Sequence, residues 1–213
     1  NLIGAFHPPA LVVADPLTLR RLPEREYRAG LAEAVKHGLI EDPAYFAWIE
    51  SETRGLLGRD LEVMTRLIRR SVEIKAAVVS ADEREGGRRA TLNAGHTVAH
   101  APEQASAYRI PHGEAVGLGM IAECRIAEQA GLAVVGLSAR VSALLSRLEL
   151  PVRQQSGASV EDLLLAMTQD KKNRSGLIRL TLPAALGRMH EGDGSWTIPV
   201  DRSLLEVGLA AIA

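Results

Sequence analysis

Three of the six histidines lie close together in the sequence, namely His96, His100 and His112. His96 and His100 stand four residues apart, so on a helix both imidazole rings would lie on one face. Such a pair can supply two ligands of one metal ion, or one ligand and one acid–base group. The metalloprotease helix motif requires glutamate directly after the first histidine; Thr97 stands there, which excludes that class. For this pair alone, two ordinary surface or core histidines remain the alternative.

The remaining members of a possible metal site are His112 and Glu33. His112 precedes Gly113 at the start of an apolar stretch, where the glycine would let a backbone or ligand approach, although a helix cap is the plainer interpretation. Glu33 is surrounded by apolar residues, and burying a lone carboxylate costs several kcal/mol unless a cation is near. Lys36 could form a simple salt bridge with Glu33, or could face an anionic substrate while Glu33 binds a metal. Two histidines and one carboxylate with open positions suit catalytic zinc.

Other charged residues could bind an anion. Lys75 interrupts an apolar stripe, where a lysine that extends to the surface is an equally good interpretation. The segment 170–174 holds three cations at the end of a helix, which is electrostatically normal and also suits a phosphate or carboxylate. Glu85, Arg89 and Asn93 recur at four-residue intervals before the histidine pair and would share one face if the nearby glycines permit a helix.

These residues need a scaffold, which the hydrophobic pattern indicates. Apolar residues at helical spacing predict helices at 24–40, from Asp42, at 60–80, 93–101, 114–129, 138–148 and 159–168, and from Asp201. In the helix 60–80 the pattern places Val72 in the buried stripe. An apolar run at 11–14 predicts a strand, and alternation at 178–182 and 196–200 predicts a small antiparallel sheet. The prediction is a mainly α fold with minor β structure.

Composition supports this architecture and excludes several functions. The chain has 213 residues, of which 46% are hydrophobic and only 3% aromatic, which favours packed helices over a β-sandwich. A net charge of −1 without basic clusters argues against nucleic acid as a partner. No apolar run approaches the roughly 20 residues that cross a bilayer, and there is no signal peptide. The single cysteine, Cys124, fits a reducing cytoplasm. A start at Asn1 indicates a fragment of a longer protein.

Several separated motifs, in the same order, resemble 3-dehydroquinate synthase. They are NLIGAF (1–6), LP (22–23), GLAEAVK (30–36), LNAGHTVAH (92–100), HGEAV (112–116) and DKK (170–172). The resemblance implies that 1–213 is the family's helical C-terminal domain, with 1–23 belonging to the interdomain region. The family's N-terminal NAD-binding domain is not visible in this sequence.

The resemblance also implies roles for individual residues. The metal ligands, for Zn²⁺ or possibly Co²⁺, would be Glu33, His96 and His112. The substrate-binding residues would be Asn1, Lys36, Lys75, Arg89, Asn93, His100 and one of Lys171 and Lys172. The catalytic residues would be His100, Glu85 and Lys36, the first two in proton transfer. The segment bordering NAD would be Thr18, Leu19, Arg20 and Arg21.

The implied reaction converts the sugar acid phosphate DAHP to 3-dehydroquinate in the shikimate pathway. NAD transiently oxidises a hydroxyl, phosphate is eliminated, the hydride returns, and an aldol step closes the ring. The family is usually homodimeric. Its alternatives here are a related sugar phosphate cyclase, such as 2-deoxy-scyllo-inosose synthase, a non-catalytic metal-binding fragment, or a structural helical protein.

Two residues depart from the family pattern. Ala99 stands where glycine is usual, and Pro102 stands where an aliphatic residue is usual. Proline removes a backbone donor and presses on the carbonyl of residue 98, so the helix after His100 should kink or stop. A kink at Pro102 would shift His100 more than His96, because His96 lies earlier in the helix.

Overall fold

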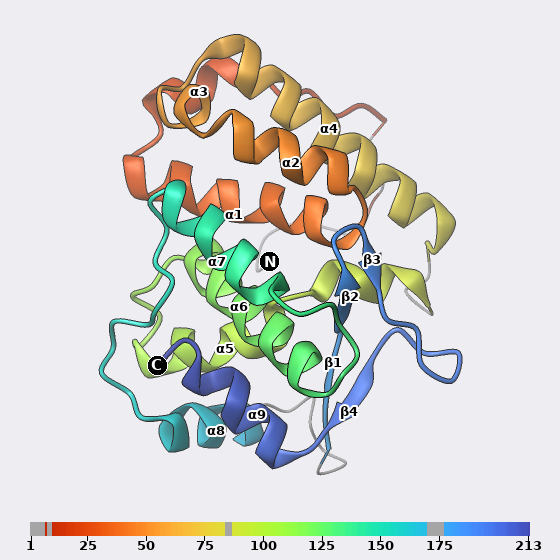
Figure 1. Ribbon diagram of the computed structural model, residues 1–213. Coiled ribbons are helices and arrows are strands. Elements are labelled where there is room, and N and C mark those ends of the chain that lie inside the picture. Colours follow the sequence, from red (N-terminus) through yellow and green to blue (C-terminus); the bar gives the residue numbers. More distant parts are fainter. Residues whose placement is uncertain (1–6, 8–9, 84–86, 170–176) are drawn as a thin grey trace.

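The computed structural model describes residues 7, 10–83, 87–169 and 177–213, and helices dominate it (Figure 1). The helices are α1 (Glu24–Ile40), α2 (Pro43–Ser51), α3 (Thr53–Leu57), α4 (Leu61–Ala81), α5 (His96–Ala105), α6 (His112–Gln129), α7 (Leu137–Arg147), α8 (Val160–Gln169), α9 (Arg202–Ala210) and two 3-10 helices, η1 (Pro16–Arg21) and η2 (Arg88–Asn93). Within the described ranges, no helix combines the length and the apolar character needed to span a bilayer. The predicted mainly α fold is confirmed.

Aspartates set the starts of three helices. The side chains of Asp42, Asp60 and Asp201 each accept a hydrogen bond from a backbone N–H in the first turn of α2, α4 and α9. This capping satisfies donors that the helix itself leaves free. Pro43 follows Asp42 at the first helical position, where its missing N–H costs nothing. The helix starts predicted at these aspartates are confirmed.

The β structure consists of two small antiparallel pairs near the C-terminus. β1 (Ile178–Leu180) pairs with β4 (Ile198–Val200), so that Ile178 lies opposite Val200. β2 (Pro183–Ala185) pairs with β3 (Arg188–Met189). The first pair confirms the antiparallel sheet predicted from the alternating pattern.

The strand predicted at 11–14 is wrong for this structure. These residues have no regular structure, and Leu11, Val12 and Val13 are 78%, 74% and 80% exposed. A strand needs a neighbour that pairs with its N–H and C=O groups, and no described residue pairs with this run. The three consecutive side chains therefore form an exposed apolar run.

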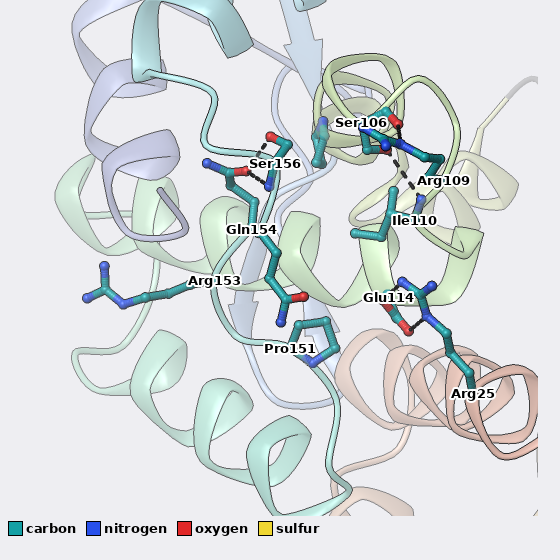
Figure 2. A pocket seen from close by; sticks show the side chains of 11 residues that line it. Arg25, Ser106, Arg109, Ile110, Glu114, Pro151, Arg153, Gln154 and Ser156 are labelled. Carbon is teal, nitrogen blue, oxygen red and sulfur yellow. Dashed lines mark hydrogen bonds and ion pairs between the residues drawn. The ribbon is translucent and has the colours of Figure 1, made fainter.

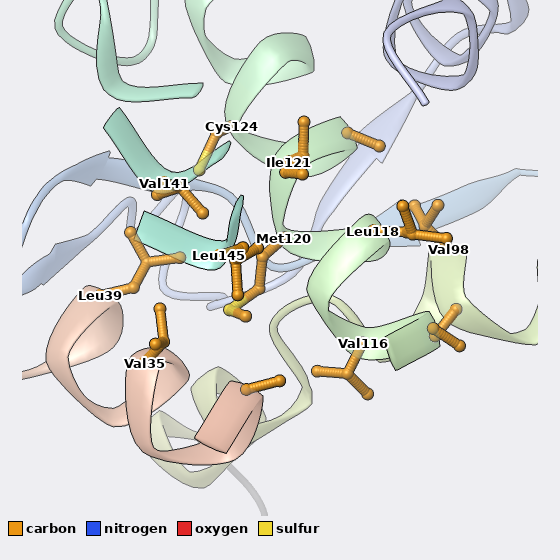
Figure 3. Close-up of a cluster of buried hydrophobic side chains, with 14 of the residues drawn as sticks. Val35, Leu39, Val98, Val116, Leu118, Met120, Ile121, Cys124, Val141 and Leu145 are labelled. Carbon is orange, nitrogen blue, oxygen red and sulfur yellow. The ribbon is translucent and has the colours of Figure 1, made fainter. Parts of the chain in front are cut away.

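Helix α6 is the centre of the molecule. It packs against α1, α5, α7 and α9, and fourteen of its eighteen residues are buried. Figure 3 shows Met120 and Cys124 of α6 among side chains of the neighbouring helices, including Val35 of α1 and Leu145 of α7. Because most of α6 is buried, packing of the helix fixes the backbone at its first residue, His112, whose own side chain is exposed.

The buried stripe of α4 differs from the predicted one. The buried residues are Met64, Leu67, Ile74 and Val78, whereas Val72 is 55% exposed. The inward position between Leu67 and Ile74 belongs to Ser71, whose hydroxyl lies 2.8 Å from the hydroxyl of Tyr45. A search for apolar periodicity passes over a polar residue that is satisfied inside the fold. Lys75 lies next to the buried residue Ile74 of this stripe and lines a pocket.

Alanine substitutions at two glycines of α6 should have opposite effects on stability. A Cβ on Gly119 would lie 1.9 Å from the carbonyl oxygen of Gly95, whereas a Cβ on Gly117 would meet only side-chain carbons of Leu145 and Ala32, at 3.5–4.0 Å. Gly119→Ala is therefore expected to lower the free energy of unfolding by about 2–3 kcal/mol or more. Gly117→Ala, the matched control, should be neutral or stabilising, because alanine favours helix by up to ~1 kcal/mol. Urea denaturation measures both, and equal stability of the two variants would contradict the close approach.

Candidate metal centre

Three side chains from three helices meet at one point. Glu33 comes from the middle of α1, His96 is the first residue of α5, and His112 is the first residue of α6. The Nε2 atoms of the two histidines are 3.3 Å apart, and each lies 3.7 Å from Oε1 of Glu33. All three ligand atoms lie within 4.8 Å of one another, so this group could hold a metal ion. The residues that the sequence resemblance selected are thus brought together.

The spacing and the donor set fit a metal. Two nitrogen ligands bound at about 2.0–2.1 Å to one tetrahedral ion lie about 3.3 Å apart. That is the separation between His96 and His112. Two imidazoles and one carboxylate leave a coordination position open for water or substrate, as in catalytic rather than structural zinc sites. The cluster therefore has the composition of a site that works on a bound molecule.

Outer hydrogen bonds orient the two imidazole rings. Nδ1 of His112 lies 2.8 Å from Oε1 of Glu103, and Nδ1 of His96 lies 3.2 Å from the carbonyl oxygen of Ala94. Both partners accept hydrogen bonds, which places the proton of each neutral ring on Nδ1 and leaves the Nε2 lone pair facing the centre. Such outer contacts fix the tautomer and orientation of metal-binding histidines. Glu103 was not recognised in the sequence, where it is one of many helical glutamates.

Charges around the cluster favour the metal-binding ionisation states. Burial opposes the charge of Glu33, but Lys36 and the two histidines outweigh burial and lower the pKa of Glu33. Burial, reinforced by Lys36, lowers the pKa of His96. At neutral pH Glu33 is consequently ionised and His96 is neutral, as binding to a metal requires. Nζ of Lys36 lies 2.5 Å from Oε2 of Glu33, on the carboxylate oxygen that does not face the histidines.

A pocket of about 430 Å³ adjoins the cluster. Its lining residues are Glu33, Lys36, His37, Lys75, Arg89, Leu92, Asn93 and His96. Four predicted substrate-binding residues are therefore beside the candidate metal ligands. His37 was missed, since nothing but its place after Lys36 distinguishes it in the sequence. Burial lowers the pKa of His37 to about 4, so it lines the pocket as a neutral ring at pH 7.

Hydrogen bonds to the side chain of Asp82 hold the start of η2, which carries Arg89 at this pocket. Oδ2 of Asp82 accepts hydrogen bonds from the backbone N–H groups of Gly87, at 2.8 Å, and Arg89, at 2.9 Å. The Arg89 guanidinium donates to the carbonyl oxygen of Glu83 at 2.8 Å. Arg89 and Asn93 lie in η2, a 3-10 helix, in which residues four apart do not share one face as predicted, yet both line this pocket.

Other predicted site residues lie elsewhere. His100 is half-buried in α5, one turn beyond His96, and is not among the residues that line the pocket. Thr18, Leu19, Arg20 and Arg21 belong to η1, whose carbonyl oxygens at Leu19 and Arg20 accept hydrogen bonds from the Arg59 guanidinium. The remaining four predicted residues lie outside the described part of the chain: Asn1, Glu85, Lys171 and Lys172.

Pro102 does not stop α5. The helix continues through it to Ala105, contrary to the expectation that it might end after His100. Ala99, Ala101 and Pro102 are all buried, so packing on this face compensates for the hydrogen bond that proline cannot make. Both departures from the family pattern, at Ala99 and Pro102, thus lie on the packed face of α5.

A second pocket lies beside the start of α6, where an ion pair joins α6 to α1. It has a volume of about 270 Å³, and Figure 2 shows Arg25 of α1 facing Glu114 of α6 at its edge. Nε and one terminal nitrogen of Arg25 donate to the two Glu114 oxygens at 2.7 and 2.9 Å. This two-point pairing joins the first turns of α1 and α6. No residue predicted for the active site lines this second pocket.

Comparisons with known proteins agree with this geometry. Residues 30–173 match the family described as 3-dehydroquinate synthase C-terminal. The 3-dehydroquinate synthase of Symbiobacterium thermophilum is 46% identical over 190 residues, covering 89% of this chain and 53% of that protein. That of Gloeobacter violaceus is 48% identical over 193 residues, covering 90% and 53%. The chain thus spans about half the length of the curated relatives it matches.

Solved structures share the fold. A 2-deoxy-scyllo-inosose synthase complexed with carbaglucose-6-phosphate, NAD⁺ and Co²⁺ superposes with a TM-score of 0.86 at 24% identity, covering 100% of this chain and 59% of that one. A 2-epi-5-epi-valiolone synthase from Streptomyces hygroscopicus, with NAD⁺ and Zn²⁺ bound, has a TM-score of 0.82 at 25% identity, covering 99% and 57%. Taken with the family match over 30–173, the conclusion is plain: this chain belongs to the 3-dehydroquinate synthase C-terminal family.

Proposed function

We propose that this chain is the metal- and substrate-binding part of a 3-dehydroquinate synthase, a phosphorus–oxygen lyase that converts DAHP to 3-dehydroquinate and phosphate. The reaction would proceed by transient oxidation with NAD, phosphate elimination, reduction and intramolecular aldol closure. One observation carries the proposal: Glu33 and His96, two members of the candidate metal cluster with His112, line the same pocket as Lys36, Lys75 and Arg89. Relatives named 3-dehydroquinate synthase, about 45% identical over most of the chain, support the choice of reaction.

The cations suit a substrate that carries a phosphate and a carboxylate. Lys36, Lys75 and Arg89 line the pocket, and among the described residues the only carboxylate beside them is that of Glu33. Arginine can hold a phosphate or carboxylate at two points, whereas lysine acts as a point charge. The Asn93 amide adds a neutral donor and acceptor for sugar hydroxyls. In this proposal Lys36 is both a binding and a catalytic residue, because it lies beside the metal cluster.

Glu33, His96 and His112 would hold Zn²⁺, or Co²⁺ in its place. When bound, the metal would polarise the substrate oxygens at the carbon that is oxidised. The two similar structures contain Zn²⁺ or Co²⁺ together with NAD⁺, which supports both cofactors for this chain. Glu103 and the carbonyl of Ala94 would hold the rings in the orientation that this requires.

Proton transfer and the remaining substrate contacts are proposed from the resemblance. His100, one turn beyond His96 in α5, would exchange protons with the substrate together with Glu85. The other residues proposed to bind substrate are Asn1 and one of Lys171 and Lys172.

A nucleotide-binding domain is the proposed partner of the N-terminal region, residues 1–23. Leu11, Val12 and Val13 are an exposed apolar run directly before η1. Consecutive exposed apolar residues are typical of a surface that another element covers. We propose that this domain covers them and holds NAD against Thr18–Arg21, and that the complete enzyme is a homodimer.

A chimera tests the proposed reaction. This chain would replace the matching half of the Symbiobacterium thermophilum relative, and phosphate release would be measured with NAD, zinc and either DAHP or glucose 6-phosphate. Release from DAHP alone is expected, because the pocket offers enough cations for two anionic groups. The unmodified relative serves as the positive control.

The other outcomes separate the alternatives. Turnover of glucose 6-phosphate alone would replace the proposal with a related sugar phosphate cyclase. Zinc binding without release from either substrate, in a folded chimera, would support a non-catalytic metal-binding fragment.

A further inference from the structure

One peptide group links the candidate metal ligand His96 to a buried carboxyl group. The carbonyl oxygen of Ala94 lies 3.2 Å from Nδ1 of His96. The N–H of the same peptide unit, which belongs to Gly95, donates to Oε2 of Glu123 at 2.7 Å. A peptide unit is planar and rigid, so a contact that fixes its N–H also fixes the direction of its C=O. The chain of contacts runs from Glu123 through the peptide to the imidazole.

The same turn is held by backbone contact with α6. Gly95 has φ +81°, a left-handed conformation that favours glycine, and it caps the start of α5. The carbonyl oxygen of Gly95 would lie 1.9 Å from a Cβ on Gly119, so α6 touches this turn directly. Glu123 stands one helical turn beyond Gly119 and reaches the turn from the same face of α6. Helix α6 therefore contacts Gly95 at two points: Glu123 accepts from its N–H, and Gly119 packs against its carbonyl oxygen.

Packing alone does not explain why a glutamate occupies position 123. Glu123 is 1% exposed, and Oε1 has no hydrogen-bond partner in the described part of the chain. An apolar residue would fill this place without leaving a buried polar atom unsatisfied. Among the described residues, the carboxyl makes its hydrogen bond to Gly95 alone. Burial also raises the pKa of Glu123 to about 8, so the neutral acid predominates at pH 7.

We propose that Glu123 is a positioning residue for the metal centre: through the Ala94–Gly95 peptide it orients the His96 ring so that Nε2 faces Glu33 and His112. This inference rests on the proposed metal site. It extends that site to a residue that touches neither metal nor substrate. Removing the orienting contact leaves the ligand in place but lets its ring and the preceding turn move, which lowers metal affinity.

The test separates the effect of side-chain length at position 123 from the effect of its charge, in the 213-residue chain. Zn²⁺ affinity is measured by competition with a chromophoric chelator, and the visible spectrum of bound Co²⁺ reports the ligand geometry. Glu123→Gln keeps an acceptor at the same distance and resembles the neutral acid, so affinity within about threefold of wild type is expected. Glu123→Asp keeps the carboxyl but shortens it, and Glu123→Met removes it at similar volume. Both should weaken Zn²⁺ binding by roughly 10–100-fold and alter the Co²⁺ spectrum.

Controls distinguish positioning from a structural role. Cys124→Ala removes buried volume from the next residue of α6, and the unfolding midpoint of each metal-free variant is recorded alongside its affinity. Folded Asp and Met variants with wild-type affinity and an unchanged Co²⁺ spectrum would overturn the inference. So would a Cys124→Ala variant that weakens binding as much as they do. If Glu123→Met does not fold, the Asp and Gln variants still decide the question.

Failure of the metal site itself would look different. If His112→Ala binds Zn²⁺ as tightly as wild type, the three-ligand cluster is wrong and the proposed function loses its basis. If His112→Ala weakens binding and the Glu123 variants do not, the cluster stands and only the role of Glu123 falls.

Discussion

Replacing His112 with alanine is expected to lower the Zn²⁺ affinity of the chain more than ~100-fold while leaving the metal-free fold intact. A catalytic zinc site has three protein ligands, and loss of one exceeds the 10–100-fold effect typical of an outer contact. The side chain of His112 is 54% exposed, and its removal costs chiefly the hydrogen bond to Glu103, so the free energy of unfolding should fall by about 1 kcal/mol. Isothermal titration with Zn²⁺ and urea denaturation in the presence of a chelator measure the two quantities.

The companion variant Glu33→Gln should lose affinity to a similar degree but at a cost to the metal-free fold. It leaves the ammonium of Lys36, whose side chain is only 6% exposed, without its ion-pair partner. His190→Ala controls for general loss of a histidine, since His190 does not belong to the cluster. Unchanged zinc content in both His112→Ala and Glu33→Gln would rule out the three-ligand centre.

The second large effect is expected in the pH dependence of stability. Burial raises the pKa of Glu123 from 4.5 to about 8, so the unfolded chain loses this proton at lower pH than the folded one. The contribution of the neutral acid is fully present below pH 4.5 and is lost as the pH rises to about 8. Glu123→Gln cannot ionise. Its advantage in free energy of unfolding over wild type should therefore grow between pH 5 and pH 8, reaching on the order of 3–5 kcal/mol.

Urea denaturation of metal-free protein at pH 5, 7 and 9 measures this difference. Glu26→Gln, at an exposed position of α1, controls for the loss of one formal charge. Parallel stability curves for wild type and Glu123→Gln across this range would show that the carboxyl is not held in the buried, uncharged form.

Local patterns predicted the helices well because each carries its own signals. The aspartate caps at Asp42, Asp60 and Asp201 and the apolar spacing between them fix elements without reference to distant contacts. The same reasoning failed where tertiary partners decide the outcome. Ser71 takes an inward position because the Tyr45 hydroxyl is there, and the run 11–14 has no strand to pair with among the described residues.

The candidate site shows the same division. Spacing alone pairs His96 with His100, since both would lie on one helix face. The structure instead sets His96 against His112, with Glu33 from α1 between them, a grouping that requires α1, α5 and α6 to be packed together. Only the resemblance selected this set from the sequence. The orienting residues Glu103 and Glu123 were not selected at all, because a glutamate in a helix carries no sign of what its side chain will meet.

The arrangement of the Glu33 carboxylate bears on how electrophilic the centre would be. One oxygen faces the two imidazoles, while the other is bound to the fixed ammonium of Lys36. Such a carboxylate shares its electron density between two cations, and the two histidine ligands are neutral donors. An ion held there would keep most of its double positive charge, and it would draw electrons from a substrate oxygen more strongly than an ion bound by an unshared carboxylate. Lys36 would in this way increase the Lewis acidity of the bound ion without contacting it.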